Sequence, residues 1–461
     1  MAGATGGAVC RGGGADGDHP GAAGGGWGVS AEWPEARLGD LVDIKHGFAF
    51  KGEFFTDQPT GALLLTPGNF AIGGGFQFNK LKFYKDGPIP PDYVLQTGDL
   101  LVTMTDLSKA GDTLGYSAVV PDSDYLMLHN QRLGKVTAKN QGVDLGFIHW
   151  LLRDERYRAE VLGSATGSTV KHTSPGRIGA YRFRLPPLPE QRAIAATLGA
   201  LDDKIELNRK MNATLEAMAR ALFRNWFVDF GPTRARMEGR APYLTPDLWS
   251  LFPDRLDDEG KPEGWAAGTL GAVATARNEG VDPSAISPET PYIGLEHMPR
   301  GSIALTDWEG AGKVSSNKAA FVAGDFLFGK LRPYFHKVGI APVSGICSTD
   351  IVVVRPKSAK WSGFVIACIS DEDFVAYTDK TSTGTKMPRT SWSIMAKYPV
   401  ALPPADLADA YNAIVAPKLD RIRANIHESR TLAQTRDLLL PRLMSGEIRI
   451  RDAERLVEEA G

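Results

Sequence analysis

Residues 185–230 read LPPLPEQRAIAATLGALDDKIELNRKMNATLEAMARALFRNWFVDF, and residues 402–446 read LPPADLADAYNAIVAPKLDRIRANIHESRTLAQTRDLLLPRLMSG. Both stretches begin with Leu-Pro-Pro, and both then carry apolar residues at alternating spacings of about four and three, the period of a helix with one apolar seam. A helix from Glu190 to about Val228 would be about 58 Å long at 1.5 Å per residue. The seam positions are Ile194, Leu198, Leu201, Ile205, Leu215, Ala219, Leu222 and Trp226 in the first stretch and Tyr411, Val415, Ile422, Leu432, Leu439 and Leu443 in the second.

Two long helices in one chain, each with an apolar seam, are expected to pack together as a coiled coil. Asn208 and Asn425 occupy equivalent seam positions, where a buried amide fixes the register. Alternatively, each could be an ordinary core helix that covers its own sheet, but most globular helices have only about 11–12 residues. We therefore predict a helical spacer that is held together by Leu198, Leu201, Ile205, Asn208, Leu215, Leu222, Ile422, Asn425, Leu432 and Leu439.

The two stretches belong to a repeat with a fixed offset of 217 residues. Upstream of the helices the matches continue without a gap, so that the repeat covers more than seventy residues. They include Gly146-Phe147 with Gly363-Phe364, Thr166-Gly167 with Thr383-Gly384, and Tyr181 with Tyr398. Matches nearer the beginning of each copy need small shifts, such as Gly98-Asp99 with Gly324-Asp325 and Trp33 with Trp265. The period is too long for a solenoid unit, so each copy is expected to be a domain plus a long helix.

Each copy begins with short apolar runs between Gly, Pro and Asp residues, which predicts strands and turns of a mixed α/β domain. One helix is expected near Leu145–Leu162 and its equivalent near Ser362–Tyr377. The predicted linker between the halves is rich in Pro, Gly and charge, with Trp249, Leu251 and Phe252 as anchors. The predicted segments are a disordered Gly-rich tail (1–32), a first domain (33–187), a first long helix (188–230), the linker (231–263), a second domain (264–403), a second long helix (404–446) and a C-terminal tail (447–461).

Composition excludes several classes of protein. The 461 residues are 43% hydrophobic with a net charge of −2, so there is ample core and no overall charge that favours nucleic acid or an anionic membrane. Three scattered cysteines indicate neither a metal site nor a disulfide framework. The first 28 residues contain twelve glycines and no apolar signal region, and no apolar run is long enough to span a membrane, so we expect a cytoplasmic protein.

Three fragments resemble enzyme motifs, and each lacks an essential part. The stretch Gly324–Leu331 approaches a phosphate-binding loop, but Leu331 stands where a hydroxyl must reach Mg²⁺. The set Asp254, Glu259 and Lys261 resembles a nuclease set but lies in the linker without a strand to hold it. Arg332-Pro-Tyr-Phe335 resembles a methyltransferase loop without its Asn and second Pro. The chain therefore shows no catalytic set and no metal site that we would assign.

Local patches carry the signals for nucleic acid. Residues 33–187 contain 17 Lys/Arg against 16 Asp/Glu, and residues 262–403 contain 14 against 13, so neither domain is basic overall. The loop Thr166–Arg177 and its repeat Thr381–Ser391 combine hydroxyls, glycines and cations without an acid, the groups that bind phosphates. A solvated polar loop is the alternative, and recurrence in both copies favours function. The predicted DNA-binding residues are Ser168, Thr169, Lys171, His172, Arg177, Gln131, Arg132, Lys330, Arg332, Thr385, Lys386 and Arg389.

With the repeat, the helices and these loops together, the chain resembles the specificity (S) subunit of type I restriction-modification systems over nearly all of residues 33–450. The most specific segments are Leu185–Arg192, Ala221–Phe230 and Leu438–Ile448, supported by Leu38-Gly-Asp-Leu and Gly98-Asp-Leu-Leu. The second copy departs from the pattern, because Pro404-Ala-Asp-Leu replaces the Pro-Leu-x-Glu-Gln opening of the first long helix.

The resemblance implies two target recognition domains, 33–187 and 264–403, each reading half of a split double-stranded DNA sequence. The two long helices would pair antiparallel and set the unread gap. Two modification subunits would carry S-adenosylmethionine and methylate adenine, and a restriction subunit would use ATP and Mg²⁺, so this chain would hold no cofactor and perform no catalysis. The alternatives are a chain that itself methylates or cuts DNA, and a coiled-coil adaptor that never touches DNA.

Overall fold

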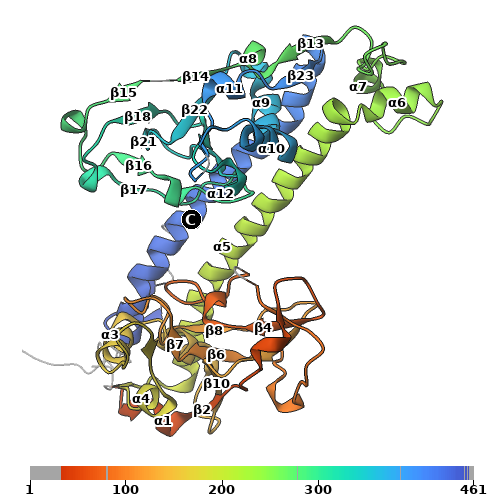
Figure 1. The fold of residues 1–461 in the computed structure, drawn as a ribbon. Coiled ribbons are helices and arrows are strands. Elements are labelled where there is room, and N and C mark those ends of the chain that lie inside the picture. The colour runs from red at the N-terminus through yellow and green to blue at the C-terminus, as the bar shows by residue number, and fades with distance from the viewer. Residues whose placement is uncertain are drawn as a thin grey trace, which may run out of the picture.

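The computed structural model describes residues 33–78, 81–277, 279–384, 386–450, 452, 453 and 455. Two globular domains of mixed helix and strand lie at opposite ends of a pair of long helices (Figure 1). The predicted two-domain α/β fold is thus confirmed. The tail predicted to be disordered, residues 1–32, lies outside the described residues, as do parts of 447–461.

The first domain is built on two four-stranded sheets, ordered β2-β10-β6-β8 and β3-β5-β4-β9. A separate antiparallel pair, β1 with β12, joins the beginning of the domain to its end. Strand β6 is buried along its whole length, as its continuous apolar sequence predicts. The elements are β1 (Glu35–Arg37), α1 (Leu38–Leu41), β2 (Val42–His46), β3 (Phe55–Thr56), β4 (Ala62–Leu65), β5 (Phe83–Tyr84), β6 (Leu100–Thr103), β7 (Thr105–Asp106), β8 (Ser117–Val119), β9 (Leu126–His129), β10 (Leu133–Ala138), α2 (Leu145–Leu151), α3 (Glu155–Gly163), β11 (Lys171–His172), α4 (Pro175–Gly179) and β12 (Arg182–Arg184).

The second domain repeats this plan. Its sheet β14-β22-β19-β20 matches β2-β10-β6-β8 strand for strand, and the pair β13–β23 matches β1–β12. Its other sheet has five strands, ordered β15-β18-β21-β16-β17. The elements are β13 (Ala266–Thr269), α8 (Leu270–Val273), β14 (Ala274–Arg277), β15 (Gly280–Val281), β16 (Pro291–Ile293), β17 (Glu309–Gly310), β18 (Lys318–Phe321), β19 (Phe326–Gly329), β20 (Val338–Ile340), β21 (Gly345–Cys347), β22 (Ile351–Pro356), α9 (Ser362–Ile369), α10 (Glu372–Lys380), α11 (Trp392–Met395) and β23 (Pro399–Leu402).

The prediction of a single helix in each domain was wrong, because the structure has two shorter helices in each of these stretches. In the first domain α2 ends before Asp154, whose carboxylate accepts a hydrogen bond of 2.8 Å from the Arg156 amide and begins α3. In the second domain Asp371 does the same for α10 through the Asp373 amide, at 2.9 Å. Aspartate at this position satisfies an amide that the helix leaves free, and it therefore favours a new start over continuation.

The two long helices are α5 (Leu188–Phe223), which continues through a π-helical turn (Arg224–Val228), and α12 (Ala405–Ser445). They lie side by side through the middle of the molecule (Figure 1). Their contacts run in opposite directions: Asp202 pairs with Arg436, Asn212 with Asn425, and the Ala219 carbonyl with the Tyr411 hydroxyl. The helices are therefore antiparallel.

The predicted seam residues fill the space between the helices and the two domain cores. Leu198, Leu201, Asn208, Ile422, Asn425, Leu432 and Leu439 are buried, whereas Ile205, Leu215 and Leu222 are half-buried and pack on the same clusters. The ends of both helices also contribute to a domain core. Leu198 of α5 and Leu443 of α12 lie in the core of the first domain, and Val415 of α12 and Phe223 of α5 lie in that of the second. Each domain is consequently fixed to both helices.

The segment predicted to be a linker has more structure than its composition suggests. It contains α6 (Gly231–Met237) and α7 (Pro246–Ser250) beside the end of α5 (Figure 1). Phe252 is buried, and its ring lies 5.1 Å from that of Trp226. Among the predicted anchors, Phe252 therefore ties the segment to the aromatic cluster at this end of the coiled coil.

Two polar pairs mark the centre of the coiled coil. The Asn425 side chain donates to the Asn212 Oδ1 at 2.8 Å, and the Asn208 side chain donates to the Ser429 hydroxyl at 3.3 Å. The offset of 217 residues relates the two pairs, because it places position 208 on 425 and position 212 on 429. The pseudo-two-fold axis that relates the two halves of the chain therefore passes between the pairs. Asn208 also donates to Glu428 at 2.9 Å.

We expect the Asn212–Asn425 pair to fix register at a cost in stability. Asn425→Leu alone should lower the melting temperature, because it leaves the buried Asn212 amide without its partner. The double change Asn212→Leu with Asn425→Leu should raise it above that of the single variant, because two leucines fill an apolar seam. Thermal unfolding followed by circular dichroism measures both, and a double variant less stable than the single one would contradict this view.

Each domain is locked to the coiled coil by a joint, and the two joints differ in chemistry. At the first, Arg153 lies between the domain and α5, with its side chain only 4% exposed and its Nη1 2.6 Å from the Asp202 Oδ2. Arg153 also donates through Nε to the Gly73 carbonyl at 2.8 Å. Arg436 of α12 pairs with the other oxygen of Asp202. One carboxylate therefore links the first domain to both long helices.

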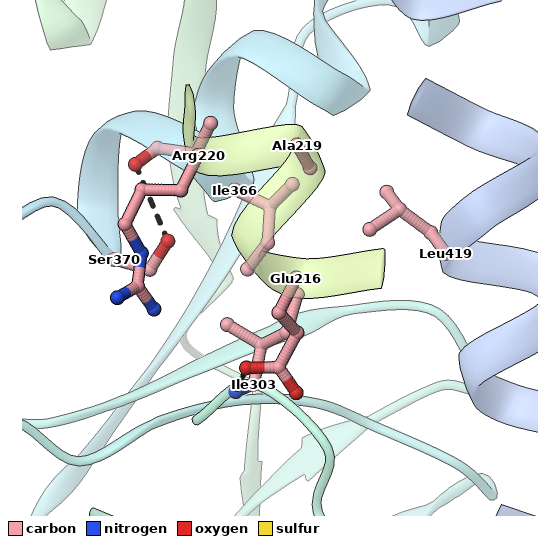
Figure 2. Close-up of a pocket in the computed structure, with 8 residues that line it drawn as sticks. Glu216, Ala219, Arg220, Ile303, Ile366, Ser370 and Leu419 are labelled. Atoms are coloured by element: carbon pink, nitrogen blue, oxygen red, sulfur yellow. Dashed lines mark hydrogen bonds between the residues drawn. The ribbon is translucent and has the colours of Figure 1, made fainter. Parts of the chain in front are cut away.

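At the second joint, the equivalent positions hold Ser370, Leu419 and Ala219, which surround a small cavity of about 10 Å³. Figure 2 shows Leu419 on one helix facing Ala219 on the other. One polar link here is Glu216 of α5, which accepts hydrogen bonds from the Ile303 amide at 3.0 Å and the Ser302 hydroxyl at 2.8 Å. Glu216 is buried, and burial raises the pKa of its carboxyl group. The three positions equivalent to Arg153, Asp202 and Arg436 thus carry no charge at the second joint. A separate ion pair, with the Arg224 Nη1 2.9 Å from the Asp371 Oδ2, ties the end of α5 to the second domain.

Candidate nucleic-acid interface

In the first domain, three separate segments meet where strand β6 ends. The Met104 amide, just beyond β6, donates to the Arg132 carbonyl at 2.9 Å, and the Thr173 amide donates to the Met104 carbonyl at 3.0 Å. Strands β7 and β11 then pair, with Lys171 opposite Asp106. The predicted turn at Gln131–Arg132 and the predicted hydroxyl loop at Thr166–Arg177 are therefore neighbours, although the sequence separates them.

The second domain brings the equivalent segments together in the same way. The Lys330 amide, just beyond β19, donates to the Asp350 carbonyl at 2.9 Å, and the Thr390 amide donates to the Lys330 carbonyl at 2.9 Å. The Arg332 amide reaches the Pro388 carbonyl at 2.8 Å. We call each of these meeting points a strand-exit junction, defined by Met104, Arg132 and Thr173 in the first domain and by Lys330, Asp350 and Thr390 in the second.

The two predicted hydroxyl loops correspond to each other in the same way as the strands do. Thr166 bridges His172 in the first loop, and Thr383 bridges Arg389 in the second, each across a glycine with φ of +94°. Gly167 and Gly384 are favoured there because side chains other than glycine rarely adopt such φ values. The two hydroxyl loops are therefore the same turn in both copies, which is the structural basis of their shared offset of 217.

Most of the predicted DNA-binding side chains reach the surface at these junctions. Lys171, Lys330 and Arg332 are half-buried, and Thr385 lies outside the described residues. The exposed ones are Ser168, Thr169, His172, Arg177, Gln131, Arg132, Lys386 and Arg389. Each junction consequently presents hydroxyls and cations together, which is an arrangement suited to a phosphate backbone and to base edges beside it.

Several polar contacts hold these side chains in place. The Arg177 Nη1 donates to the Thr166 hydroxyl at 3.2 Å, and the His172 Nδ1 lies 3.2 Å from the Thr105 hydroxyl. The Arg389 Nη2 lies 3.0 Å from the Asp350 carboxylate. Asp350 was not predicted from the sequence, because a single acid in a Ser-Thr-Asp turn carries no signal of its own.

A second acid missed by the sequence reasoning organises the loop beyond β7. Burial tends to raise the pKa of the Asp106 carboxyl group, but hydrogen bonds from the Thr113 hydroxyl and from the Ser108 and Thr113 amides outweigh it and lower the pKa. The Ser108 amide lies 2.6 Å from the carboxylate. The ionised Asp106 therefore shapes the loop that flanks Lys171.

Exposed apolar side chains accompany both junctions and were also missed. Leu107 is 64% exposed next to Asp106, and Tyr334 is 50% exposed in the turn that follows Arg332. That turn is strained, because Arg332 and His336 both have φ of +50°. The His336 Nε2 is held 3.0 Å from the Ser370 carbonyl.

The fragments that resembled enzyme motifs have structural roles. Phe326–Gly329 of the phosphate-loop-like stretch is the buried strand β19, and Lys261 pairs with Asp257 and Glu259 in the segment between the domains. Among the described residues, Glu296, His297 and Glu309 lie close enough together to suggest a metal site. The His297 Nδ1, however, accepts a hydrogen bond of 2.9 Å from the Gly294 amide. Neutral His297 therefore carries its proton on Nε2, which is the wrong form for binding a metal through that atom.

We expect the double variant Lys171→Ala with Arg177→Ala to weaken DNA binding at every sequence. Losing two phosphate contacts should also reduce the slope of log affinity against log salt by about 2. Lys51→Ala with Lys85→Ala removes the same charge from exposed positions of this domain outside the junction, and it should leave the slope nearly unchanged. Titrations by fluorescence anisotropy at several salt concentrations measure this, and equal slopes for both double variants would argue against phosphate contacts at the loop.

Comparison with known proteins finds similarity to one family of DNA specificity proteins. Residues 30–217 match the family model of the type I restriction modification DNA specificity domain. Over its length the chain is similar to type I specificity subunits. The MjaIX specificity subunit of Methanocaldococcus jannaschii is 23% identical over 74% of this chain and 76% of its own length. The HindI specificity subunit of Haemophilus influenzae is 22% identical over 91% of this chain and all of its own length.

A solved specificity subunit has the same fold. The S subunit of a type I restriction-modification system from M. genitalium superimposes with a TM-score of 0.54 at 15% identity, covering 91% of this chain and 97% of its own. Within the part of the chain that the structure describes, no helix is both long enough and apolar enough to cross a membrane.

Proposed function

We propose that this chain is the DNA specificity subunit of a type I restriction-modification complex, and that it reads a bipartite double-stranded target. The observation that carries the proposal is the pair of equivalent strand-exit junctions, one in each domain at opposite ends of an antiparallel coiled coil. Each junction would read one half of the target. The chain would recognise and position DNA, and it would perform no catalysis itself.

The coiled coil supports a role as a spacer. The two joints lie at Asp202 and Ala219 of α5, which are 17 residues apart and so about 26 Å along the helix axis. That distance corresponds to about 7–8 base pairs at 3.4 Å each. Because both domains are fixed to both helices, the spacer would hold the two reading surfaces at a set separation.

The partners follow from the same proposal. Two modification subunits would bind S-adenosylmethionine and methylate adenines in the target, and a restriction subunit would supply ATP- and Mg²⁺-dependent cleavage. This chain would hold none of these cofactors and would place the modification subunits on the DNA. The near-neutral charge of the chain is compatible with this role, since the partners could supply much of the phosphate contact.

The test is to co-express the full chain with a type I modification subunit from the same genome and to map methylated adenines by long-read sequencing. We expect a bipartite motif with one fixed gap. Methylation at a continuous motif would overturn the two-site proposal. A stable complex that neither binds nor methylates DNA would favour the coiled-coil adaptor instead.

A further inference from the structure

Two positions at the strand-exit junctions are structurally equivalent but carry different residue types. One lies in the turn before the last strand of the central sheet, where the first domain has Arg132 and the second has Asp350. The other lies in the hydroxyl loop, where the first domain has His172 and the second has Arg389. The backbone hydrogen bonds of Met104 and Lys330 fix these positions in the same way in both copies, so the difference lies in the side chains.

In the second domain the two positions form an ion pair. The Arg389 Nη2 lies 3.0 Å from the Asp350 carboxylate, and their side chains are 52% and 27% exposed. The Asp350 amide donates a hydrogen bond to the Ser348 hydroxyl oxygen at 3.2 Å, which holds the turn. In the first domain His172 instead lies beside the Thr105 hydroxyl, and Arg132 is exposed. The first domain thus has a cation in the turn, where the second domain has the carboxylate that pairs with Arg389.

The Arg389–Asp350 pair is poorly suited to phosphate attraction and well suited to reading a base. Its carboxylate cancels much of the charge that would draw a phosphate, whereas an unpaired cation such as a lysine would serve that purpose better. A carboxylate that binds one edge of a guanidinium limits its rotation and leaves the remaining N–H groups free to donate. Two such donors match the O6 and N7 acceptors of guanine in the major groove.

Stability does not account for the pair. An exposed ion pair typically contributes little to the free energy of folding. The pair also lies outside the hydrophobic clusters of the second domain. Stability therefore gives little reason for an acid beside the cations of this junction, whereas recognition of a base gives one.

We propose that Arg389, held by Asp350, reads one guanine in the half-site of the second domain, and that the residue types at 132 and 172 set the corresponding base for the first domain. This inference rests on the proposed function, since it names the residues that give each junction its preference. It also explains how two copies of one fold would read different half-sites.

The experiment uses the full complex with its modification subunit and a library of targets in which both half-sites are randomised. With Arg389→Ala, discrimination for guanine at one position of the second half-site should fall by about 10-fold or more, while the first half-site stays unchanged. Asp350→Asn should cause a smaller loss at the same position, because Arg389 remains but is held less firmly. Lys386→Ala removes an exposed cation from the same loop, and it should weaken all sequences alike.

The outcomes separate this inference from the proposed function. If Arg389→Ala weakens every sequence equally and the bipartite motif persists, Arg389 contacts phosphate and this inference fails alone. If the unaltered complex shows no bipartite motif, the proposed function fails. A gain of preference is the stricter test: Arg132→Asp with His172→Arg copies the second junction into the first, and it should introduce a guanine preference into the first half-site. No new preference in a complex that still methylates would overturn the inference.

Discussion

Asp202→Ala is expected to lower the free energy of unfolding by about 3–5 kcal/mol, the usual cost of removing one partner of a buried ion pair. The change would leave the guanidinium of Arg153, whose side chain is 4% exposed, without its carboxylate in the first joint. Arg436 would lose the same partner from α12. The neighbouring exposed residue provides a control, because Asp203→Ala should alter stability by less than about 0.5 kcal/mol.

A second variant distinguishes the loss of a partner from general damage. Arg153→Ser, Asp202→Leu and Arg436→Ala together would copy the three uncharged positions of the second joint into the first. We expect this triple variant to recover much of the lost stability, because replacing a complete buried ion network with apolar groups is often neutral. Urea unfolding of the two variants and the control measures all three effects. A triple variant no more stable than Asp202→Ala would mean that the joint depends on shape and not on charge.

The same joint should make the free energy of unfolding depend on pH in the acidic range. Burial tends to raise the pKa of Asp202, but the charges of Arg153 and then Arg436 outweigh it and hold the pKa below its ordinary value. A group with a depressed pKa in the folded state contributes stability above its unfolded pKa, about 4, and loses it as the pH falls through the folded value. Below about pH 4 the unaltered chain should therefore lose stability relative to the triple variant, which lacks this carboxylate.

Lengthening both long helices by seven residues should lengthen the unread gap while leaving both half-sequences unchanged. Seven residues add about 10 Å of helix, or about three base pairs, and they preserve the spacing of the seam. The insertions belong between Leu207 and Asn208 and between Arg430 and Thr431. Contacts of the first domain reach Asp202 and Arg436 on one side of this level, and Arg430 contacts Trp308 of the second domain on the other.

Methylation mapping of the lengthened chain with its modification subunit measures the gap and the half-sites separately. An insertion into α5 alone is the control, and it should destabilise the coiled coil because the two seams no longer match. An unchanged gap with altered half-sequences would contradict the role of the helices as a spacer.

Sequence reasoning found the long helices and the repeat because these depend on spacing, which one chain displays directly. Asn208 and Asn425 lie in the contact between the long helices, as predicted, and the predicted pairing of the helices is confirmed. The break at Asp154 was missed because an aspartate inside an apolar stretch is as compatible with a helix surface as with a new start. The packed segment around Phe252 was missed because its partner, Trp226, lies in a different element.

The site was only partly predictable for a related reason. The hydroxyl loops share the offset of 217, whereas Met104 and Lys330 are 226 residues apart, like the matched Gly98 and Gly324, and Arg132 and Asp350 are 218 apart. The three segments of a junction therefore do not share one offset, and the sequence alone does not indicate that they meet. Arg132 and Asp350 also have opposite charge, and no comparison of residue types would match them. Backbone hydrogen bonds revealed the correspondence, and these depend on the fold and not on the side chains.

The difference between the joints has a consequence for how such genes could exchange parts. Recombination could replace the first domain with a copy of the second domain while leaving the helices unchanged. Ser370 would then occupy the position of Arg153, and Asp202 and Arg436 would lose Arg153 from their ion network. A crossover within the helices would instead carry each domain with its own half of the joint on the same helix. Inheritance of a new specificity at this locus is therefore easiest between chains that share the same joint, however different their reading loops have become.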